Sequence, residues 1–166
     1  MQIQGENRRL VKFIWAAAIF FAWGLIQGAI QTQEPVRLFL GQGPAAMIGS
    51  AHVHIALMGW LSLALMAAVY YLVPIFSGKA IVWQRLIDWI FWVFVVCTAV
   101  GGVLMIIGGI VGGSAFAAGV AGAALGSIIV PYVMPGGLLC TIAAIAGLMF
   151  VVQVLVSLTR GSKVAG

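Results

Sequence analysis

Apolar residues occur in four long runs, which short polar or charged segments separate. The runs cover approximately residues 10–31, 45–75, 86–113 and 135–158. A helix needs about 20 consecutive apolar residues to cross the hydrocarbon core of a bilayer, and each run is long enough. Pro135 suits the first turn of a helix, where its missing N–H is not needed. The pattern predicts one all-α transmembrane domain, residues 1–166, built as a four-helix membrane bundle.

Two segments make the number of helices ambiguous. The first run follows Arg8, Arg9 and Lys12, as the apolar part of a signal peptide would. It is longer than such a part, and no convincing small-residue cleavage site follows it, so we expect a helix of the protein itself. Residues 114–130 are apolar and rich in Ala and Gly, and they could form a fifth span. We expect them instead to belong to an outer loop, about 114–134, packed on the membrane face.

The basic residues decide between four spans and five. With four spans, seven of the eight Lys and Arg residues lie on one side of the membrane, and only Arg37 lies on the other. Lys and Arg are enriched on the cytoplasmic side of membrane proteins. We therefore predict that both termini are cytoplasmic. A fifth span would move Arg160 and Lys163 to the outer side and weaken this asymmetry.

Composition supports an integral membrane protein. Hydrophobic residues make up 64% of the chain and charged residues 7%, whereas soluble domains carry about a quarter charged residues. The net charge of +5 does not indicate a nucleic-acid partner, because the basic residues cluster at the ends of apolar runs. Cys97 and Cys140 lie within apolar runs and are typical of buried residues, not of a disulfide framework. We expect a multi-pass protein of the inner (cytoplasmic) membrane, in contact with the lipid bilayer.

Small residues recur at a spacing that brings membrane helices together. Three pairs of glycines are four residues apart: Gly108 and Gly112, Gly109 and Gly113, and Gly122 and Gly126. This spacing lets two helix backbones approach closely in lipid. Two interpretations fit, namely packing within one chain and an interface between copies of the chain.

His52 and His54 are the only histidines, and they lie near the outer end of the second predicted helix. Ionisable residues inside a membrane helix are costly and are candidates for function. Residues two apart on an α-helix point about 200° apart, so these imidazoles cannot bind one ion from one face but could serve two sites. Ala56 and Gly59 fall below His52 and would leave room for a flat macrocycle. The structural alternative is two buried histidines bonded to the backbone or to each other.

The segment around these histidines resembles a known family. It is similar to the tenth helix of subunit I of the haem–copper oxidases, which reads Ala-His-Phe-His and later Phe-Pro-Leu-Phe-Ser-Gly. The histidines followed by Gly59-Trp60 also resemble the second helix of the nitric oxide reductase branch. The similarity covers residues 51–78 of the 166. The matching residues are Ala51-His52-Val53-His54, Gly59, Met66, Tyr70, Pro74 and Ile75-Phe76-Ser77-Gly78.

The resemblance implies that both histidines bind haem iron. In the family helix the first histidine binds the active-site haem and the second binds the low-spin haem, and these positions are His52 and His54 here. The family helix runs inward from the outer face, in agreement with the orientation predicted from charge. We therefore expect haem b as the cofactor. Arg37 could pair with haem propionates or remain a solvated charge, and Trp60 could pack on the macrocycle or on a helix.

The sequence lacks the residues for the family's whole reaction. The family's copper site needs three further histidines, and its low-spin haem needs another ligand on a separate helix. This chain has no histidine besides His52 and His54, although Met58 or Met134 could replace one of them as an axial ligand. We expect no copper at such a site, and no reduction of oxygen or nitric oxide by this chain alone.

The missing ligand and the number of helices together suggest an oligomer. The family's subunit has twelve helices in three arcs of four, and this chain would form one arc. Three copies in a closed ring would place His52 of one copy and His54 of the next at one gap, as the two axial ligands of a haem. The sequence thus predicts a homotrimer that carries single electrons, with a quinol or another respiratory redox partner.

Two other functions also fit the sequence. The first is a five-coordinate haem protein that binds O2 or NO, which an open iron would distinguish. The second is a non-redox accessory or assembly subunit of a respiratory complex, which would purify without haem.

Overall fold

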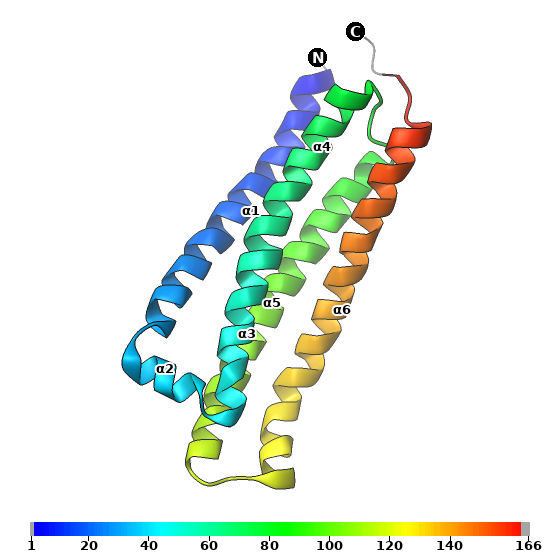
Figure 1. Ribbon diagram of the computed structural model, residues 1–166. Helices are drawn as coiled ribbons and strands as arrows, with labels where there is room; N and C mark the ends of the chain where they lie inside the picture. The colour runs from blue at the N-terminus through cyan, green and yellow to red at the C-terminus, as the bar shows by residue number, and fades with distance from the viewer. Residues whose placement is uncertain (1, 164–166) are drawn as a thin grey trace.

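Helices form nearly all of the structure, a computed structural model that describes residues 2–163 and the side chains from Arg9 onward (Figure 1). Four stretches are long and apolar enough to cross a membrane: Arg9–Gln31, Gly43–Ser77, Gln84–Ala117 and Gly122–Arg160. The prediction of an all-α, multi-pass membrane protein with four spans is confirmed. The elements in chain order are α1 (Gln2–Gln31), α2 (Glu34–Leu40), the 3₁₀-helix η1 (Gly43–Ala45), α3 (Ala46–His54), the π-helix η2 (Ile55–Ser62), α4 (Leu63–Ser77), α5 (Gln84–Ala117) and α6 (Gly122–Arg160).

The predicted outer loop at 114–134 is wrong. Helix α5 continues to Ala117 and α6 begins at Gly122, so only residues 118–121 connect them. Pro135 lies inside α6 and does not mark its start. A helix pairs the backbone groups of an apolar segment, whereas a loop in the same place would leave them unpaired. The distribution of Lys and Arg gave the correct number of spans. It carries no information on how far α5 and α6 extend, because lengthening these two helices moves no charge across the membrane.

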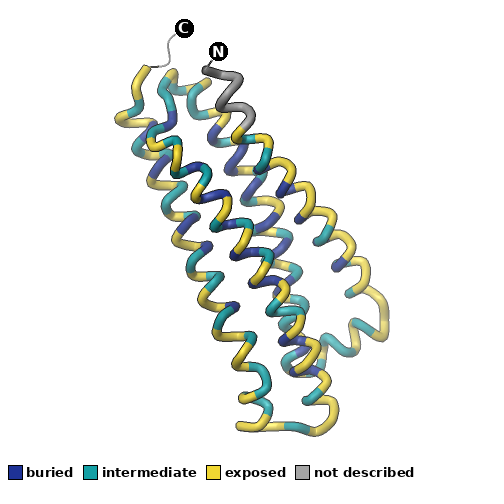
Figure 2. Tube along the Cα trace, turned by 180° about the vertical axis from the view of Figure 1, so that it is seen from behind, coloured by how far each residue is buried: buried dark blue, intermediate teal, exposed yellow. Residues whose placement is uncertain are grey.

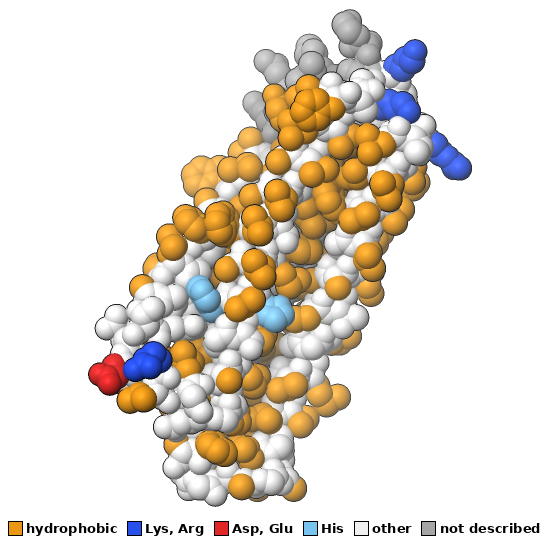
Figure 3. Space-filling model, viewed as in Figure 1, with side chains coloured by type: hydrophobic (Ala, Val, Ile, Leu, Met, Phe, Trp, Pro, Cys, Tyr) orange, Lys and Arg blue, Asp and Glu red, His pale blue; other side chains and the backbone are white. Residues whose placement is uncertain are grey.

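The chain ends lie together at one end of the bundle (Figure 1). We call it the terminal end; α2 and the α5–α6 connection lie at the opposite end. Lys and Arg side chains gather at the terminal end, as the space-filling view shows (Figure 3). Buried positions face the other helices, and exposed positions follow their outer sides (Figure 2). Many of the exposed side chains are large and apolar, such as Trp15, Leu65 and Ile75, which suits contact with lipid.

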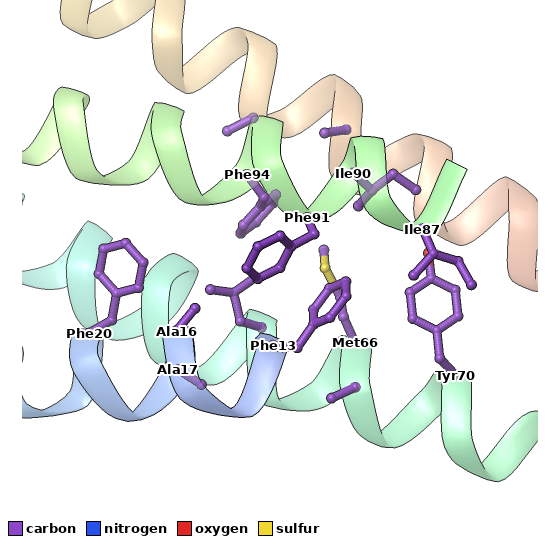
Figure 4. Close-up of a cluster of buried hydrophobic side chains, with 14 of the residues drawn as sticks. Phe13, Ala16, Ala17, Phe20, Met66, Tyr70, Ile87, Ile90, Phe91 and Phe94 are labelled. Carbon is purple, nitrogen blue, oxygen red and sulfur yellow. The ribbon is translucent and has the colours of Figure 1, made fainter. Parts of the chain in front are cut away.

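Aromatic side chains from three helices fill the core between α1, α4 and α5 (Figure 4). The rings of Phe13 and Phe91 lie 4.8 Å apart, and those of Phe13 and Tyr70 lie 6.0 Å apart. Phe13 has no exposed surface. This cluster holds the helices in the register that places the histidines.

The glycines of α5 pack within the chain. A Cβ added to Gly109 would lie 2.6 Å from Ile48, and one added to Gly113 would lie 2.6 Å from Ala45. A Cβ added to Gly108 would lie 2.7 Å from Tyr132, and one added to Gly112 would lie 2.5 Å from Ile129. The interpretation of these two pairs as packing within one chain is confirmed. Gly122 and Gly126 have no neighbouring atom within 4 Å of such a Cβ.

A hydrogen-bonded network, which we call the Gln153 network, joins α4, the α4–α5 connection and α6 at the terminal end. The Tyr70 hydroxyl donates to Gln153 Oε1 at 2.8 Å, and Gln153 Nε2 donates to the carbonyls of Val82 and Trp83 at 2.7 and 3.2 Å. The Ser157 hydroxyl donates to the Gln153 carbonyl at 2.6 Å and accepts from the Val82 N–H at 3.0 Å. Gln153 and Ser157 have no exposed surface. The network leaves these buried polar groups paired, as stability in lipid requires.

Candidate functional site

The two histidines end helix α3, and the backbone then changes its hydrogen-bonding pattern. Helix η2, which follows directly, is a π-helix of 8 residues. The Ser62 hydroxyl donates to the Leu57 carbonyl at 2.9 Å, five residues earlier. π-helical turns are rare and often occur at functional sites.

The imidazoles point to different sides of α3, as their spacing predicts. The ring of His52 faces α1, with Cε1 only 3.1 Å from the position that a Cβ on Gly28 would take. The ring of His54 faces a crevice lined by residues of α5 and α6. Both imidazoles are visible on the same face of the molecule (Figure 3). A partner that covers this face could therefore reach both.

His52 lies in an apolar groove between α1 and the α3–η2 helix, which we call the His52 groove. Its volume is about 340 Å³, at the lower end of the roughly 300–1,000 Å³ of small-molecule sites. Nδ1 of His52 is buried and has no hydrogen-bond partner among the described residues. Leaving such an atom unpaired costs about 1–3 kcal/mol. The other lining residues are Phe21, Gly24, Leu25, Gly28, Ala29, Ala56 and Trp60.

The residues below His52 differ in part from the prediction. Ala56 lines the His52 groove as expected, but Gly59 does not leave room for a macrocycle. A Cβ on Gly59 would lie 2.4 Å from the Phe20 ring, so this glycine is the point where α1 packs on η2. A π-helix holds more residues per turn than the about 3.6 of an α-helix, which turns Gly59 toward α1 and brings Trp60 under His52. Trp60 packs on Phe21 of α1 at a centroid distance of 4.4 Å, as expected for a helix contact, and it lines the groove. Its contact with a macrocycle stays a prediction.

His54 is held in one orientation by the backbone of its own helix. Nδ1 of His54 lies 2.8 Å from the Ser50 carbonyl oxygen. A carbonyl only accepts, so Nδ1 is the donor of this hydrogen bond, and in a neutral imidazole Nε2 then has the free lone pair. Histidine ligands of metals are commonly oriented in this way. Nε2 of His54 is therefore the ring nitrogen without an intrahelical partner.

The crevice beside His54 is far smaller than the His52 groove. Its volume is about 10 Å³, close to the roughly 10–15 Å³ that one water molecule needs. A haem bound to His54 would have to lie outside this crevice, on the face shared with His52. The crevice is lined by His54, Met58, Cys97, Thr98, Gly101, Gly102, Met105, Cys140 and Ala143.

Polar side chains of α1 tie that helix to α3 just before His52. Gln27 and Gln31 both donate from Nε2 to the Ile48 carbonyl, at 3.0 and 3.1 Å. Oε1 of Gln27 is buried without a partner among the described residues. Arg37 is exposed on α2, at the end of the bundle away from the termini. This position is compatible with a solvated charge and with a partner of haem propionates, the two roles expected for Arg37.

Sequence reasoning did not identify several residues of these two sites. Gly24 and Gly28 carried a detectable signal, because they are four apart on one helix like the other glycine pairs. The approach of Cys97, Met105 and Cys140 to His54 had no such signal, since it depends on how α5 and α6 pack. Within the described residues, no three His, Cys, Asp or Glu side chains are grouped to hold one metal ion. One copy of the chain thus offers single imidazoles at separate places.

Comparison with known proteins does not identify a relative. No protein-family model matches the sequence, and no curated protein or solved structure matches it significantly.

Proposed function

We propose that this chain is a membrane haem protein that carries electrons, with His52 and His54 as axial ligands of haem b. The observation that supports this most strongly is the His52 groove: apolar, with glycine and alanine on its α1 side, and containing a buried ring nitrogen without a partner. A ligand in this groove would lie beside the His52 ring, which itself packs on Gly28. Haem bound here would supply a one-electron redox centre.

The shape of the groove favours a second copy of the chain as the cover of the haem. At about 340 Å³, the groove would enclose only part of a macrocycle, and the rest would face lipid or another protein. His54 points away from the His52 groove, so a second imidazole must come from elsewhere. In a homotrimer, His54 of the neighbouring copy supplies it. The exposed Val53 and Leu57 lie between the two imidazoles and would be covered by this contact.

Two further residues complete the proposed site. Arg37, at the end away from the termini, can pair with a haem propionate through its forked guanidinium, and Trp60 lines the groove. Two imidazole ligands leave no open position on the iron, so the site transfers electrons and does not bind gases. We propose a quinol or another respiratory redox partner as the electron source, and the inner membrane, with both termini cytoplasmic, as the location.

Optical spectra of the detergent-purified protein test the proposal. We expect a low-spin b-type spectrum after dithionite reduction that carbon monoxide does not change. His52→Ala and His54→Ala should each lose most of the haem per chain, whereas the adjacent exposed Val53→Ala should keep it. Native mass spectrometry should show three copies with bound haem.

Each alternative has its own result in these experiments. A spectrum that carbon monoxide shifts would support the five-coordinate O2- or NO-binding protein. A folded protein without haem would support the accessory or assembly subunit. A monomer with full haem content would exclude ligands shared between copies, and unchanged haem in both histidine variants would exclude ligation by either.

A further inference from the structure

The first turns of α1 and α5 lie together at the terminal end and are rich in basic residues. Residues 6–12 and 84–92 carry four Lys or Arg against two Asp or Glu, a net charge of +2. We call the outer surface where these two helices meet the basic seam, and it consists of Arg9, Lys12, Arg85, Asp88 and Trp92. We propose that the basic seam binds the headgroup of an anionic phospholipid.

Contacts between α1 and α5 bring the charges of the basic seam together. Nη1 of Arg9 donates to the Gln84 carbonyl at 3.3 Å, and Nε of Arg9 lies 3.9 Å from Asp88 Oδ2. Lys12 pairs with the other carboxylate oxygen of Asp88. Arg85 is three residues before Asp88 on α5, so their Cβ atoms lie on one helix face, about 5–6 Å apart. Three cations therefore lie around a single carboxylate.

Asp88 does not neutralise these three cations. Lys12 takes one of its oxygens at close range, whereas Arg9 lies at the outer limit of an ion pair. Arg85 is exposed and has no hydrogen bond or ion pair among the described residues. The side chain of Arg9 is 43% exposed. Two guanidinium groups are thus open to an anion, and their fork of N–H donors matches the oxygens of a phosphate.

The surface next to these charges is aromatic and apolar, which favours a lipid over a free anion. Trp92 is 60% exposed and packs edge-on against Phe91 at a centroid distance of 5.1 Å. Tryptophan side chains are enriched at the boundary between membrane and water. Val96 and Val103 continue the exposed face of α5 away from Trp92, where acyl chains would lie. Basic sites between membrane helices bind anionic headgroups in this way.

The proposal goes beyond haem binding and does not depend on it. None of the residues of the basic seam lines the His52 groove or the crevice beside His54. His52→Ala and His54→Ala should therefore lose haem and keep the lipid. Loss of the lipid should leave the haem content of the chain unchanged.

Native mass spectrometry tests the site on the full chain, released from nanodiscs that contain equal amounts of phosphatidylglycerol and phosphatidylcholine. We expect the chain to retain one phosphatidylglycerol in preference to phosphatidylcholine. Arg85→Gln should lower the affinity for phosphatidylglycerol about tenfold, because it removes a charge-assisted hydrogen bond to the phosphate. Since Arg85 is exposed and unpaired in the described structure, this variant should fold like the wild type.

The matched control is Arg160→Gln, which removes an exposed cation from the last turn of α6 at the same end of the bundle. A general attraction between basic residues and an anionic membrane surface would make both variants lose affinity equally. A site at the basic seam predicts that Arg160→Gln keeps nearly the affinity of the wild type.

Four results would overturn the proposal. Equal retention of both lipids by the wild type would exclude recognition of the headgroup, and equal losses in Arg85→Gln and Arg160→Gln would exclude a local site. Displacement of phosphatidylglycerol by excess inorganic phosphate would indicate a site for the free anion. Loss of a second copy of the chain, and not of lipid, from the Arg85→Gln variant would show that another copy covers this face.

Discussion

The terminal end of the bundle and the region of the histidines differ in whether their buried polar atoms have hydrogen-bond partners. In the Gln153 network, Gln153 and Ser157 have no exposed surface and every polar atom of their side chains is paired. Around the histidines, His52 Nδ1, Gln27 Oε1 and Thr98 Oγ1 are buried and unpaired among the described residues. The first region has its buried polar atoms paired without a ligand. The second leaves three buried polar atoms without a partner among the described residues.

The largest effect is expected at Gly59, where α1 packs on η2 between the two regions. Gly59→Leu places a side chain where atoms of the Phe20 side chain already lie 2.4–2.8 Å from the added Cβ. We expect a loss of about 3 kcal/mol in the free energy of unfolding, because overpacking forces the helices apart. Tryptophan fluorescence during unfolding in sodium dodecyl sulfate measures it. Gly49→Leu is the control, since no atom lies within 4 Å of its added Cβ; equal losses in both variants would contradict this packing.

The second effect concerns the Gln153 network alone. Gln153→Leu leaves the Tyr70 hydroxyl and the Val82 and Trp83 carbonyls without this partner. We expect a loss of about 2 kcal/mol in the free energy of unfolding, with unchanged haem per folded chain.

Gln33→Leu serves as the control for Gln153→Leu. Gln33 is exposed and its only described side-chain bond is a long one of 3.4 Å to the Ala29 carbonyl. If Gln153→Leu lowered haem content and left stability unchanged, the division between the two regions would be wrong.

The sequence predicted the spans well and the local backbone less well. Four spans follow from hydropathy, since each span must be apolar and helical to exist in lipid. The extension of α5 to Ala117 and the start of α6 at Gly122 were missed because this Ala- and Gly-rich segment has no distinct hydrophobic period. The π-helical turns of η2 were missed because the sequence of residues 55–62 shows no local preference for them. In the structure they coincide with the packing of Gly59 on Phe20.

The candidate site was predictable only where one helix determines it. The opposite directions of His52 and His54 follow from their spacing within α3. Which helix each imidazole meets depends on tertiary packing, so the contact of His52 with Gly28 and the crevice beside His54 could be found only from the structure.

A third, smaller effect would sharpen the role of the His52 groove. Gly28→Ala brings a Cβ to 3.1 Å from His52 Cε1, so the ring must move by a few tenths of an ångström. We expect haem affinity to fall about tenfold, equivalent to about 1.4 kcal/mol, while stability stays near that of the wild type. Titration of the apoprotein with haem measures the affinity. Gly137→Ala, with no atom near its added Cβ, should bind haem normally, and an equal loss there would argue against the groove.

The smallest effect is expected at the ion pairs of the terminal end. Asp88 pairs with Lys12 and, at 3.9 Å, with Arg9, and its side chain is 41% exposed. Because water screens such pairs, Asp88→Asn should cost less than about 1 kcal/mol, and added salt should reduce the difference. Unfolding at low and high salt measures it, with Glu34→Gln at the opposite end as the control. A loss as large as that of Gln153→Leu would show that charge, and not hydrogen bonding, holds this end together.

The π-helix η2 has a consequence for insertions and deletions in this chain. Helices α3, η2 and α4 form one continuous rod, in which residues 55–62 hold a surplus of chain relative to an α-helix. Removing one residue there would let the rod return to α-helical winding without shortening α3 or α4. Because the π-helical winding already accommodates this residue, α3 and α4 would stay close to their present relative orientation. A deletion in the α-helical part of the rod would instead turn the two sides of the deletion by about 100° relative to each other, so η2 is where this span tolerates a change in length.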